Sequence, residues 1–394
     1  SIRRVFDTVA GWAQGEESPG LLSPAEEPVL AEAMRPFLQY GWLPQVMGLL
    51  GRQKVIRAGE LLEVYDVVAD PEEAEDLADR SRVDRRLAAA VTEYPAPAPI
   101  SPEPDSLTEE QRRQLASLGY VASDVAPVVR PDAPVPRQMT HLFEDLDLGS
   151  GLFVRQRYAE AIPVFERVLD QDPQNLMVVL RLAAAHSLLG RADAAMEAFR
   201  RAQELAPDSL DVQQYLGLHR VRVGEWERAA PLLEAVVAAT PHRLPAVEAL
   251  ARVREHQRRP ADAIRLLESV VELHPEPAGV LVRLGELHMQ MADTPGAIEA
   301  FERARRLQGD AFQHHLELGV LYLAAHRLDE ARDALDRVPP DHPAYPMALF
   351  KRAQVAVLLD EPDRQARIQA ARDHADATTG PLIENEALFR GTGI

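Results

Sequence analysis

The second half of the chain repeats every 34 residues, and this period constrains the fold more than any other feature of the sequence. The positions that mark the period are Pro173, Pro207, Pro241, Pro275, Gly309 and Pro343. A fixed period of this length is typical of a supersecondary unit that buries its apolar face only against its neighbours. Because proline cannot continue a helix from within, each proline predicts a helix boundary. We therefore expect a linear array of small helical units.

Other positions keep the same register and predict how each unit packs. A small residue recurs once per unit, an alanine follows 12 positions later, and a phenylalanine or leucine lies four positions beyond. Because two antiparallel helices approach closely only where side chains are small, the small residue of the first helix should meet the alanine of the second. The expected repeat-packing residues are Gly149, Ala161, Phe165, Ala183, Ala195, Phe199, Gly217, Ala229, Gly285, Ala297, Phe301, Gly319 and Ala331.

This residue set resembles the tetratricopeptide repeat, a helix-turn-helix unit of the same length. The resemblance covers residues 142–345 in six repeats, and a generic helical bundle with accidental spacing is the alternative. The aromatic residue that usually follows the small residue is clear only at Tyr322. The implied fold is mainly α: a tetratricopeptide α-solenoid of helix-turn-helix repeats, with a small N-terminal α+β subdomain that holds an antiparallel sheet.

Composition divides the chain into five segments. Residues 1–93 carry short β-branched runs, and residues 94–138 form a Pro-rich linker with one amphipathic helix at 107–121. Proline at this density is typical of extended, semi-rigid spacers. Residues 139–345 hold the six repeats, residues 346–378 a degraded helix pair, and residues 379–394 a tail that we expect to be loose. The degraded pair should cap the array, since terminal repeats need a polar outer face.

Four short runs in the first segment predict an antiparallel sheet. They are PVLAEAM, PQVMGLL, QKVIRAG and LLEVYDVVAD, and Gly51-Arg52 predicts a two-residue hairpin loop between the second and the third. Pro71 should open a helix with Asp70 as its N-cap and an acidic first turn. The stretch IRRVFDTVAGW predicts another helix, whose apolar face has no evident partner. A domain this small is marginal alone.

The same segment resembles the C-terminal end of the sulfatase family, in the alkaline-phosphatase-like superfamily. The motifs that carry the resemblance follow in the order VFDTVAGW, GLLSP, PVLAEAMRPFLQYGWLPQVMGLLGRQKVI and EVYDVVADPEEAEDLA. The stretch LTEEQRRQLASLGYV at 107–121 resembles the helix that some members place between the sulfatase domain and repeats. Leu50 and Gln53 depart from the family pattern, which has Asp- or Arg-type residues there.

This resemblance implies that any catalysis belongs to a domain upstream of this chain. Sulfatases use a Cys/Ser-x-Pro-x-Arg nucleophile and a divalent metal held by Asp, Asn and His, which polarises the sulfate oxygens. The chain has no cysteine and no Ser-x-Pro-x-Arg motif. We therefore assign it no catalytic residue, no metal ligand and no cofactor, and a divalent metal such as calcium would belong to the absent catalytic domain.

Three other stretches invite a functional interpretation. His314 and His315 are adjacent on a predicted helix, so they point about 100° apart and cannot easily chelate one ion. The acidic run ADPEEAEDLAD lacks the glycine and the spacing of a calcium loop. We interpret the histidines as surface or groove residues and the acidic run as a solvated helix start. Residues 40–42, Tyr-Gly-Trp, are either a loop that faces the catalytic domain or part of the sheet core.

In tetratricopeptide repeats, residues of the first helices face a concave surface where a peptide can lie. The corresponding candidate peptide groove consists of Phe143, Leu146, Phe153, Met177, Leu180, Gln214, Leu218, Arg222, Arg252, Glu255, His256, Glu286, Met289 and Gln313. Its N-terminal half is apolar, which favours an amphipathic helix or a segment of the same chain. The expected partner is a protein or peptide, with the protein's own catalytic domain as one candidate. A purely structural spacer is the alternative.

Charge and composition exclude several functions. A net charge of −19 argues against nucleic acid as the main partner, because phosphate binding needs a basic face. No apolar run approaches the ~20 residues that span a bilayer. We expect a protein-interaction or scaffold module attached to the non-catalytic part of a sulfatase-like hydrolase. The alternative is a sulfatase, or a related sulfate- or phosphate-ester hydrolase, whose metal-binding domain lies upstream.

The cellular compartment stays open. Arg-, Ala- and Pro-rich usage suggests a bacterial source. If the parent is a typical sulfatase, the protein would be exported or periplasmic, and otherwise it would be cytoplasmic.

Overall fold

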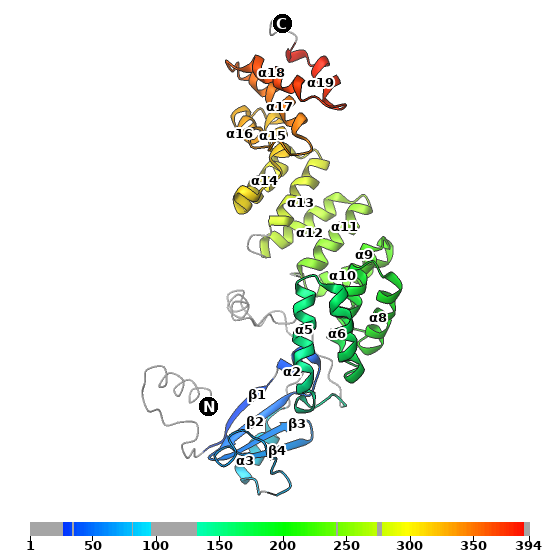
Figure 1. Cartoon of the computed structure of the whole chain (residues 1–394), viewed down its shortest axis with the longest axis vertical. Coiled ribbons are helices and arrows are strands. Elements are labelled where there is room, and N and C mark those ends of the chain that lie inside the picture. The colour runs from blue at the N-terminus through cyan, green and yellow to red at the C-terminus, as the bar shows by residue number, and fades with distance from the viewer. Residues whose placement is uncertain are drawn as a thin grey trace, which may run out of the picture. The chain divides into compact units, whose positions relative to one another are not determined.

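The structure is a computed structural model that describes residues 27–33, 35–80, 82–95, 132–241, 243–273 and 278–389. The chain divides into two compact units, residues 1–223 and 224–394, which we describe separately (Figure 1). The helices expected at 107–121 and in IRRVFDTVAGW lie outside the described residues. Among the described helices, none is both long and apolar enough to cross a membrane.

The first unit begins with the four-stranded antiparallel sheet that the sequence predicts. Its strands pair in chain order and are β1 (Val29–Ala33), β2 (Gln45–Leu50), β3 (Gln53–Ala58) and β4 (Leu61–Asp66). Gly51 has φ +59° in the loop between β2 and β3, where its register pairs Leu50 with Gln53. A left-handed residue at this position is what a tight hairpin requires.

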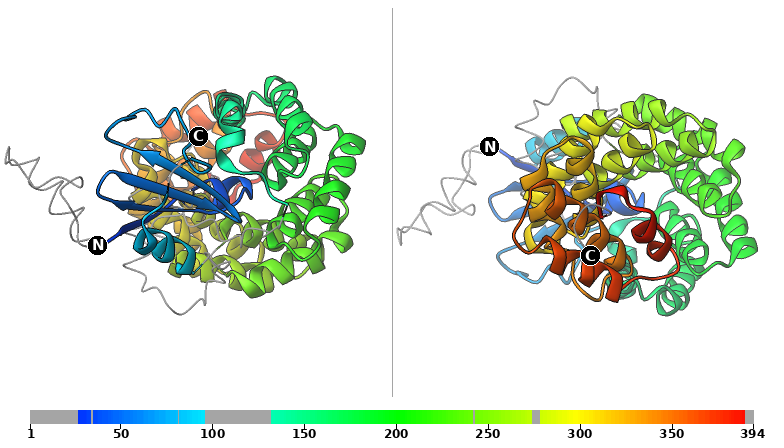
Figure 2. Two further views of the ribbon diagram at one scale, coloured as in Figure 1. Left: turned by 90° about the horizontal axis from the view of Figure 1, so that it is seen from below. Right: turned by 90° about the horizontal axis from the view of Figure 1, so that it is seen from above.

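One helix covers one face of this sheet. Helix α3 (Arg85–Glu93) lies on β2 and β3 (Figure 2). Its buried Leu87 and Val91 pack against Val46, Val55 and Val64 of the strands. Close approach is possible because β2 carries Gly48, where a Cβ would lie only 2.4 Å from Val91 Cγ2. The Asp84 side chain caps the helix by accepting a hydrogen bond from Arg86 N.

The helix expected to open at Pro71 is wrong. Residues 67–80 form turns that fold back onto β4, where Leu77 N donates to Val64 O at 2.8 Å and Val64 N donates to Asp76 Oδ1 at 3.0 Å. Glu73 has φ +55°, outside helical geometry, and both of its carboxylate oxygens accept from Lys54 Nζ. Pairing with the sheet therefore outweighs the helical preference of this acidic run.

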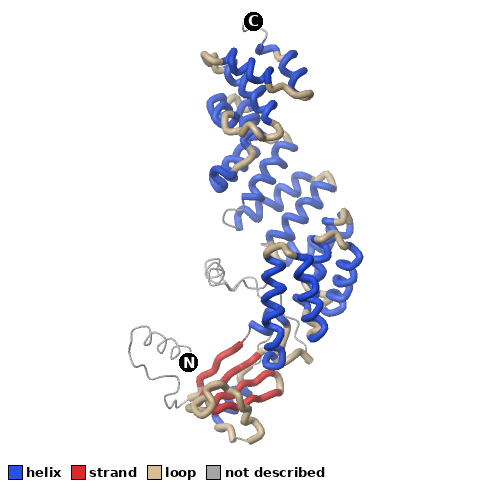
Figure 3. Tube along the Cα trace, viewed as in Figure 1, coloured by secondary structure: helices blue, strands red, loops and turns tan. Residues whose placement is uncertain are grey.

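Helices follow in pairs through the rest of the first unit (Figure 3). A 3₁₀ turn η1 (Pro136–Leu142) leads into them, and a short helix α2 (Arg35–Tyr40) from the sheet subdomain contacts α7. The paired helices are α5 (Phe143–Val154), α6 (Tyr158–Gln171), α7 (Leu176–Leu188), α8 (Ala192–Leu205) and α9 (Leu210–Arg222). Asn175 caps α7 and Ser209 caps α9, each by accepting from a backbone N–H three residues on.

The second unit continues the same alternation. Its elements are α10 (Trp226–Ala239), α11 (Leu244–His256), α12 (Pro260–Leu273), α13 (Ala278–Gln290), α14 (Thr294–Gln308), η2 (Gly309–Ala311), α15 (His315–Ala324), α16 (Leu328–Leu335), α17 (Tyr345–Leu358), α18 (Arg364–Asp373), α19 (Thr379–Asn385) and η3 (Ala387–Phe389). Gly309 ends α14 with φ +54°, a conformation that proline cannot adopt. This explains why glycine interrupts the series of prolines.

Within a pair, the helices cross closely at the small residues. A Cβ at Gly149 would lie 2.6 Å from the Phe165 ring, and one at Gly285 would lie 2.8 Å from the Phe301 ring. Gly319 faces Leu335 in the same way, at 2.7 Å. The other small and large repeat-packing residues are buried as well, and they are Ala161, Ala183, Ala195, Phe199, Gly217, Ala229, Ala297 and Ala331.

Two segments are more ordered than the sequence suggests. Residues 379–389 do not form a loose tail, because α19 and η3 pack on α17, with Ile383 and Phe389 buried against Phe350. The end of the expected Pro-rich linker is also docked: Leu43 N donates to Pro134 O at 2.9 Å, and Ala133 and Val135 are buried.

Candidate functional site

In each unit the first helices of the pairs carry the candidate groove residues, and we call their faces the first-helix surface of that unit. It comprises α5, α7 and α9 in the first unit and α11, α13, α15 and α17 in the second. In the first unit, polar side chains bridge successive first helices. Arg181 donates to Ser150 Oγ, while Ser187 Oγ lies 2.7 Å from His219 Nδ1 and accepts from Arg222.

Two candidate groove residues of the first unit belong to the core instead. Leu146 is 3% exposed and Leu180 is 0% exposed, so neither can contact a peptide on the surface. Both lie on first helices, as predicted, but their side chains turn toward the neighbouring helices. Phe153 is partly exposed and packs against Tyr158 and Phe165, with ring centroids at 5.2 and 6.3 Å. Met177, Gln214 and Leu218 are also partly exposed, and Arg222 is exposed.

Phe143, the first groove residue, is 37% exposed and contacts two aromatic rings of the sheet subdomain. The rings of Tyr40 and Trp42 lie over Phe143, with centroid distances of 6.2 and 5.6 Å. Trp42 is fully buried, and its Nε1 donates to Asp172 Oδ2 at 2.8 Å. Asn175 Nδ2 donates to the same oxygen at 2.9 Å. Tyr40 and Trp42 therefore form neither a loop toward another domain nor the core of the sheet: they anchor the sheet subdomain on the first repeat.

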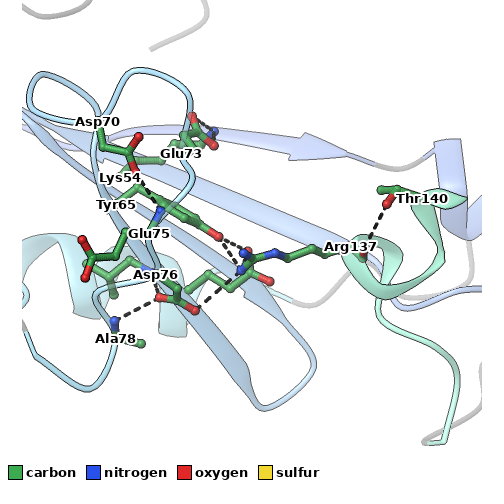
Figure 4. A network of polar contacts seen from close by, with 11 residues as sticks. Lys54, Tyr65, Asp70, Glu73, Glu75, Asp76, Ala78, Arg137 and Thr140 are labelled. Atoms are coloured by element: carbon green, nitrogen blue, oxygen red, sulfur yellow. Dashed lines mark hydrogen bonds and ion pairs between the residues drawn. The ribbon is translucent and has the colours of Figure 1, made fainter.

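A second set of contacts fixes η1 to the sheet (Figure 4). Arg137 Nη1 donates to the Tyr65 hydroxyl at 2.7 Å and lies 3.5 Å from Glu63 and 3.8 Å from Asp76. The Tyr65 hydroxyl donates to Glu63 Oε2 at 2.8 Å. Burial, followed by this hydrogen bond to Glu63, raises the pKa of Tyr65. The phenol therefore stays neutral and works as a structural link.

In the second unit the first-helix surface carries paired charges. Arg283 of α13 bonds to Glu255 of α11 and to Glu286 of its own helix, so its positive charge is fully paired. His256 stacks on Trp226, with ring centroids 4.6 Å apart and planes at 15°. Met289 packs at the edge of the core, whereas Arg252 and Gln313 are exposed. Burial raises the pKa of Glu248 on the same surface.

Exposed apolar side chains recur at the C-terminal ends of first helices. In the first unit Val154 is 80%, Leu188 is 40% and Val223 is 44% exposed, and Leu189 is exposed beside them. We call these four residues the apolar rim. Met291 and Leu358 take the corresponding places after α13 and in α17 of the second unit. Sequence reasoning missed the apolar rim because it considered the helix faces and not the helix ends.

No cluster of metal-ligating side chains was found among the described residues. Contrary to the prediction, the two adjacent histidines do not share a helix, because His314 is the N-cap of α15 and His315 its first residue. His314 stacks on Phe301 with centroids 5.6 Å apart, whereas His315 meets the edge of Phe312 at 5.0 Å. Burial lowers the pKa of His315, and its buried Nδ1 has no hydrogen-bond partner among the described residues.

Comparisons with known proteins agree on the repeat. Residues 152–219, 216–278 and 282–346 match sequence families described as tetratricopeptide repeat. Cellulose synthase 2 operon protein C of Komagataeibacter xylinus is 26% identical over 260 residues, which cover 60% of this chain and 19% of that protein. Protein FlbA of Caulobacter vibrioides is 25% identical over 242 residues, which cover 61% of this chain and 40% of that protein.

Among solved structures, PilF of Pseudomonas aeruginosa aligns over 55% of this chain and 98% of its own, with 19% identity and a TM-score of 0.44. The chain spans less than half the length of the two curated relatives. The matched residues coincide with the helix pairs whose small residues meet at each crossing. The chain is thus a tetratricopeptide-repeat protein.

Proposed function

We propose that the chain is a protein-interaction module whose first-helix surface binds a peptide segment of a partner protein. The observation that carries this proposal is the apolar rim, where three consecutive repeats expose large apolar side chains at the same end of their first helices. Contiguous exposed apolar surface on a soluble domain commonly marks an interaction site. Grooves lined by helices bind amphipathic segments through such anchors.

The groove residues that remain accessible support the same function. In the first unit they are Phe153, Met177, Gln214, Leu218 and Arg222, and in the second unit they are Arg252, Glu255, His256, Glu286, Met289 and Gln313. The first-unit set is mostly apolar and the second-unit set mostly polar or charged, so the two units would select different parts of a partner. Tyr40 and Trp42 contact Phe143, which remains 37% exposed.

Peptide binding tests this proposal directly. Fluorescence anisotropy of an array of labelled 12-residue amphipathic peptides with the full chain would identify binders. Replacing Leu188 by Asp in the apolar rim should weaken the best binder at least about tenfold, since burying a leucine is worth ~1.5–3 kcal/mol. Leu62→Asp is the matched control, because Leu62 in β4 is 43% exposed and Leu188 is 40% exposed. Equal effects of the two substitutions would contradict the proposal.

For the sheet subdomain we propose the finer assignment that its resemblance implies: the C-terminal part of a sulfatase-like hydrolase whose catalytic domain lies outside this chain. The four-stranded meander with α3 on one face supports it, because the resemblance implies a small antiparallel sheet. In the parent protein, the repeats would recruit a partner or position a sulfate or phosphate ester. That catalytic domain would supply the divalent metal.

An activity assay tests this second proposal. The 394-residue chain should not hydrolyse an aryl sulfate or an aryl phosphate above the uncatalysed rate, with or without added calcium. Turnover by this chain would contradict the assignment of catalysis to another domain. The coding sequence upstream of Ser1 should contain a Cys/Ser-x-Pro-x-Arg motif, and an open reading frame without it would make the protein a free-standing scaffold.

A further inference from the structure

Arg181 is a half-buried cation on the first-helix surface whose partner is electrically neutral. Its guanidinium donates to Ser150 Oγ on the preceding first helix. The Ser150 hydroxyl donates to Leu146 O at 2.6 Å, so its proton is already used and its oxygen is free to accept from Arg181. Among the described residues, no carboxylate forms an ion pair with Arg181.

The arginine at the corresponding position three repeats later has carboxylate partners, which Arg181 lacks. Arg283 stands 102 residues after Arg181, at the same position of its repeat, and is held by Glu255 and Glu286. Glu255 reaches Arg283 from the preceding first helix, as Ser150 reaches Arg181. In the repeat register, Phe153 and Ala184 occupy the positions of Glu255 and Glu286, so Arg181 lacks the two carboxylates that pair with Arg283 and meets the Ser150 hydroxyl instead.

A carboxylate from outside would complete the Arg181 site. Hydrogen bonds between a guanidinium and a carboxylate are charge-assisted and often bidentate, and they are stronger than those to a neutral hydroxyl. Met177 lies one helical turn before Arg181 on α7 and is partly exposed, so it offers an apolar neighbour on the same face. The apolar rim residues Val154 and Leu188 lie on the same two helices.

We propose that Arg181 receives the side-chain carboxylate of an Asp or Glu in the bound peptide, next to a large apolar residue that packs on Met177. This inference rests on the proposed peptide-binding function and names the chemistry of its ligand. The net charge of −19 works against an acidic peptide at long range. A preference for the acidic peptide would therefore report a local contact.

A pair of matched peptides tests the inference on the full chain. The probe is the tightest-binding fluorescein-labelled peptide of the array that contains Glu beside Leu, together with the same peptide carrying Gln for Glu. Wild type should bind the Glu peptide about tenfold tighter than the Gln peptide, and added salt should reduce the ratio. Arg181→Gln should bring the ratio to about one without weakening the Gln peptide. Arg181→Lys should keep part of the preference.

Arg283→Gln is the control, because carboxylates of the chain already occupy that arginine, and it should leave the Glu-to-Gln ratio unchanged. The inference is overturned if Arg181→Gln keeps the wild-type preference for the Glu peptide over the Gln peptide. It is also overturned if Arg283→Gln abolishes that preference. Loss of the preference for the Glu peptide when the peptide C-terminus is amidated would also overturn it, because the recognised carboxylate would then be the chain end and not a side chain. If both peptides bind equally, the inference fails and the proposed function stands. If no array peptide binds, both fail.

Discussion

Replacing Trp42 by Phe should detach the sheet subdomain from the first repeat. The substitution removes the hydrogen bond from Trp42 Nε1 to Asp172 Oδ2 at 2.8 Å and leaves a buried Asp172 with Asn175 as its remaining side-chain donor. A hydrogen bond to a charged group contributes ~1.5–3 kcal/mol, and the smaller ring loses about 1 kcal/mol of buried apolar contact. We expect the first unit to lose about 2–4 kcal/mol.

Urea unfolding of the full chain, followed by circular dichroism and by fluorescence, measures this loss. Two units need not unfold together, so the transition that shifts must be compared with a control in the second unit. Trp226→Phe is that control, because Trp226 stacks on His256 and is partly exposed. If Trp42→Phe shifts the unfolding free energy by less than about 0.5 kcal/mol, or no more than Trp226→Phe does, the anchoring role of Trp42 is refuted.

Three further predictions concern the packing of the second unit. Gly285→Leu should cost about 1–3 kcal/mol or more in thermal or urea unfolding, because its Cβ would meet the buried Phe301 ring, whereas Gly279→Leu, with open space around its Cβ, should be close to neutral. Phe389→Ala should destabilise the C-terminal helices by about 3–5 kcal/mol and speed amide exchange in α19, and unchanged exchange there would mean that residues 379–389 are loose after all. Burial lowers the pKa of His315, so the free energy of unfolding should fall as the pH drops below the unfolded pKa of ~6.5. His315→Gln should flatten this pH dependence relative to wild type. Parallel curves of unfolding free energy against pH for the two proteins would rule out a contribution of His315.

The repeat array could be predicted because its information is periodic. Each crossing needs one small residue and one large one, and the spacing of Gly149 and Phe165 recurs along the chain as a readable pattern. The sheet could also be predicted, from its short β-branched runs and the hairpin loop at Gly51. Both signals are local, or repeat at a fixed interval, so neither requires knowledge of distant contacts.

The errors arose where a distant partner decides the outcome. Nothing in the sequence near Trp42 indicates Asp172, which lies 130 residues away, so the anchoring of the sheet was not foreseen. Residues 71–80 have a helical composition, but the backbone N–H of Leu77 donates a hydrogen bond to Val64 O of β4. Leu146 and Leu180 were placed in the groove because they lie on first helices, although the packing of neighbouring helices buries their side chains.

One feature of the candidate site could have been found from the sequence. Arg181 and Arg283 occupy the same position of their repeats, so aligning the repeats in register places each beside the preceding first helix. The same alignment places Phe153 where the repeat of Arg283 has Glu255, and this identifies Arg181 as the arginine without that carboxylate. The prediction of groove positions missed this because it considered each repeat alone.

Amide hydrogen exchange of the full chain, with and without the tightest peptide of the array, tests the central claim most directly. If the first-helix surface binds peptides, exchange should slow in α5, α7 or α9, with smaller changes in the second helices α6 and α8. Protection confined to α6, α8 or the sheet, or no protection under saturating peptide, would contradict the claim that this tetratricopeptide-repeat protein binds its partners through its first helices.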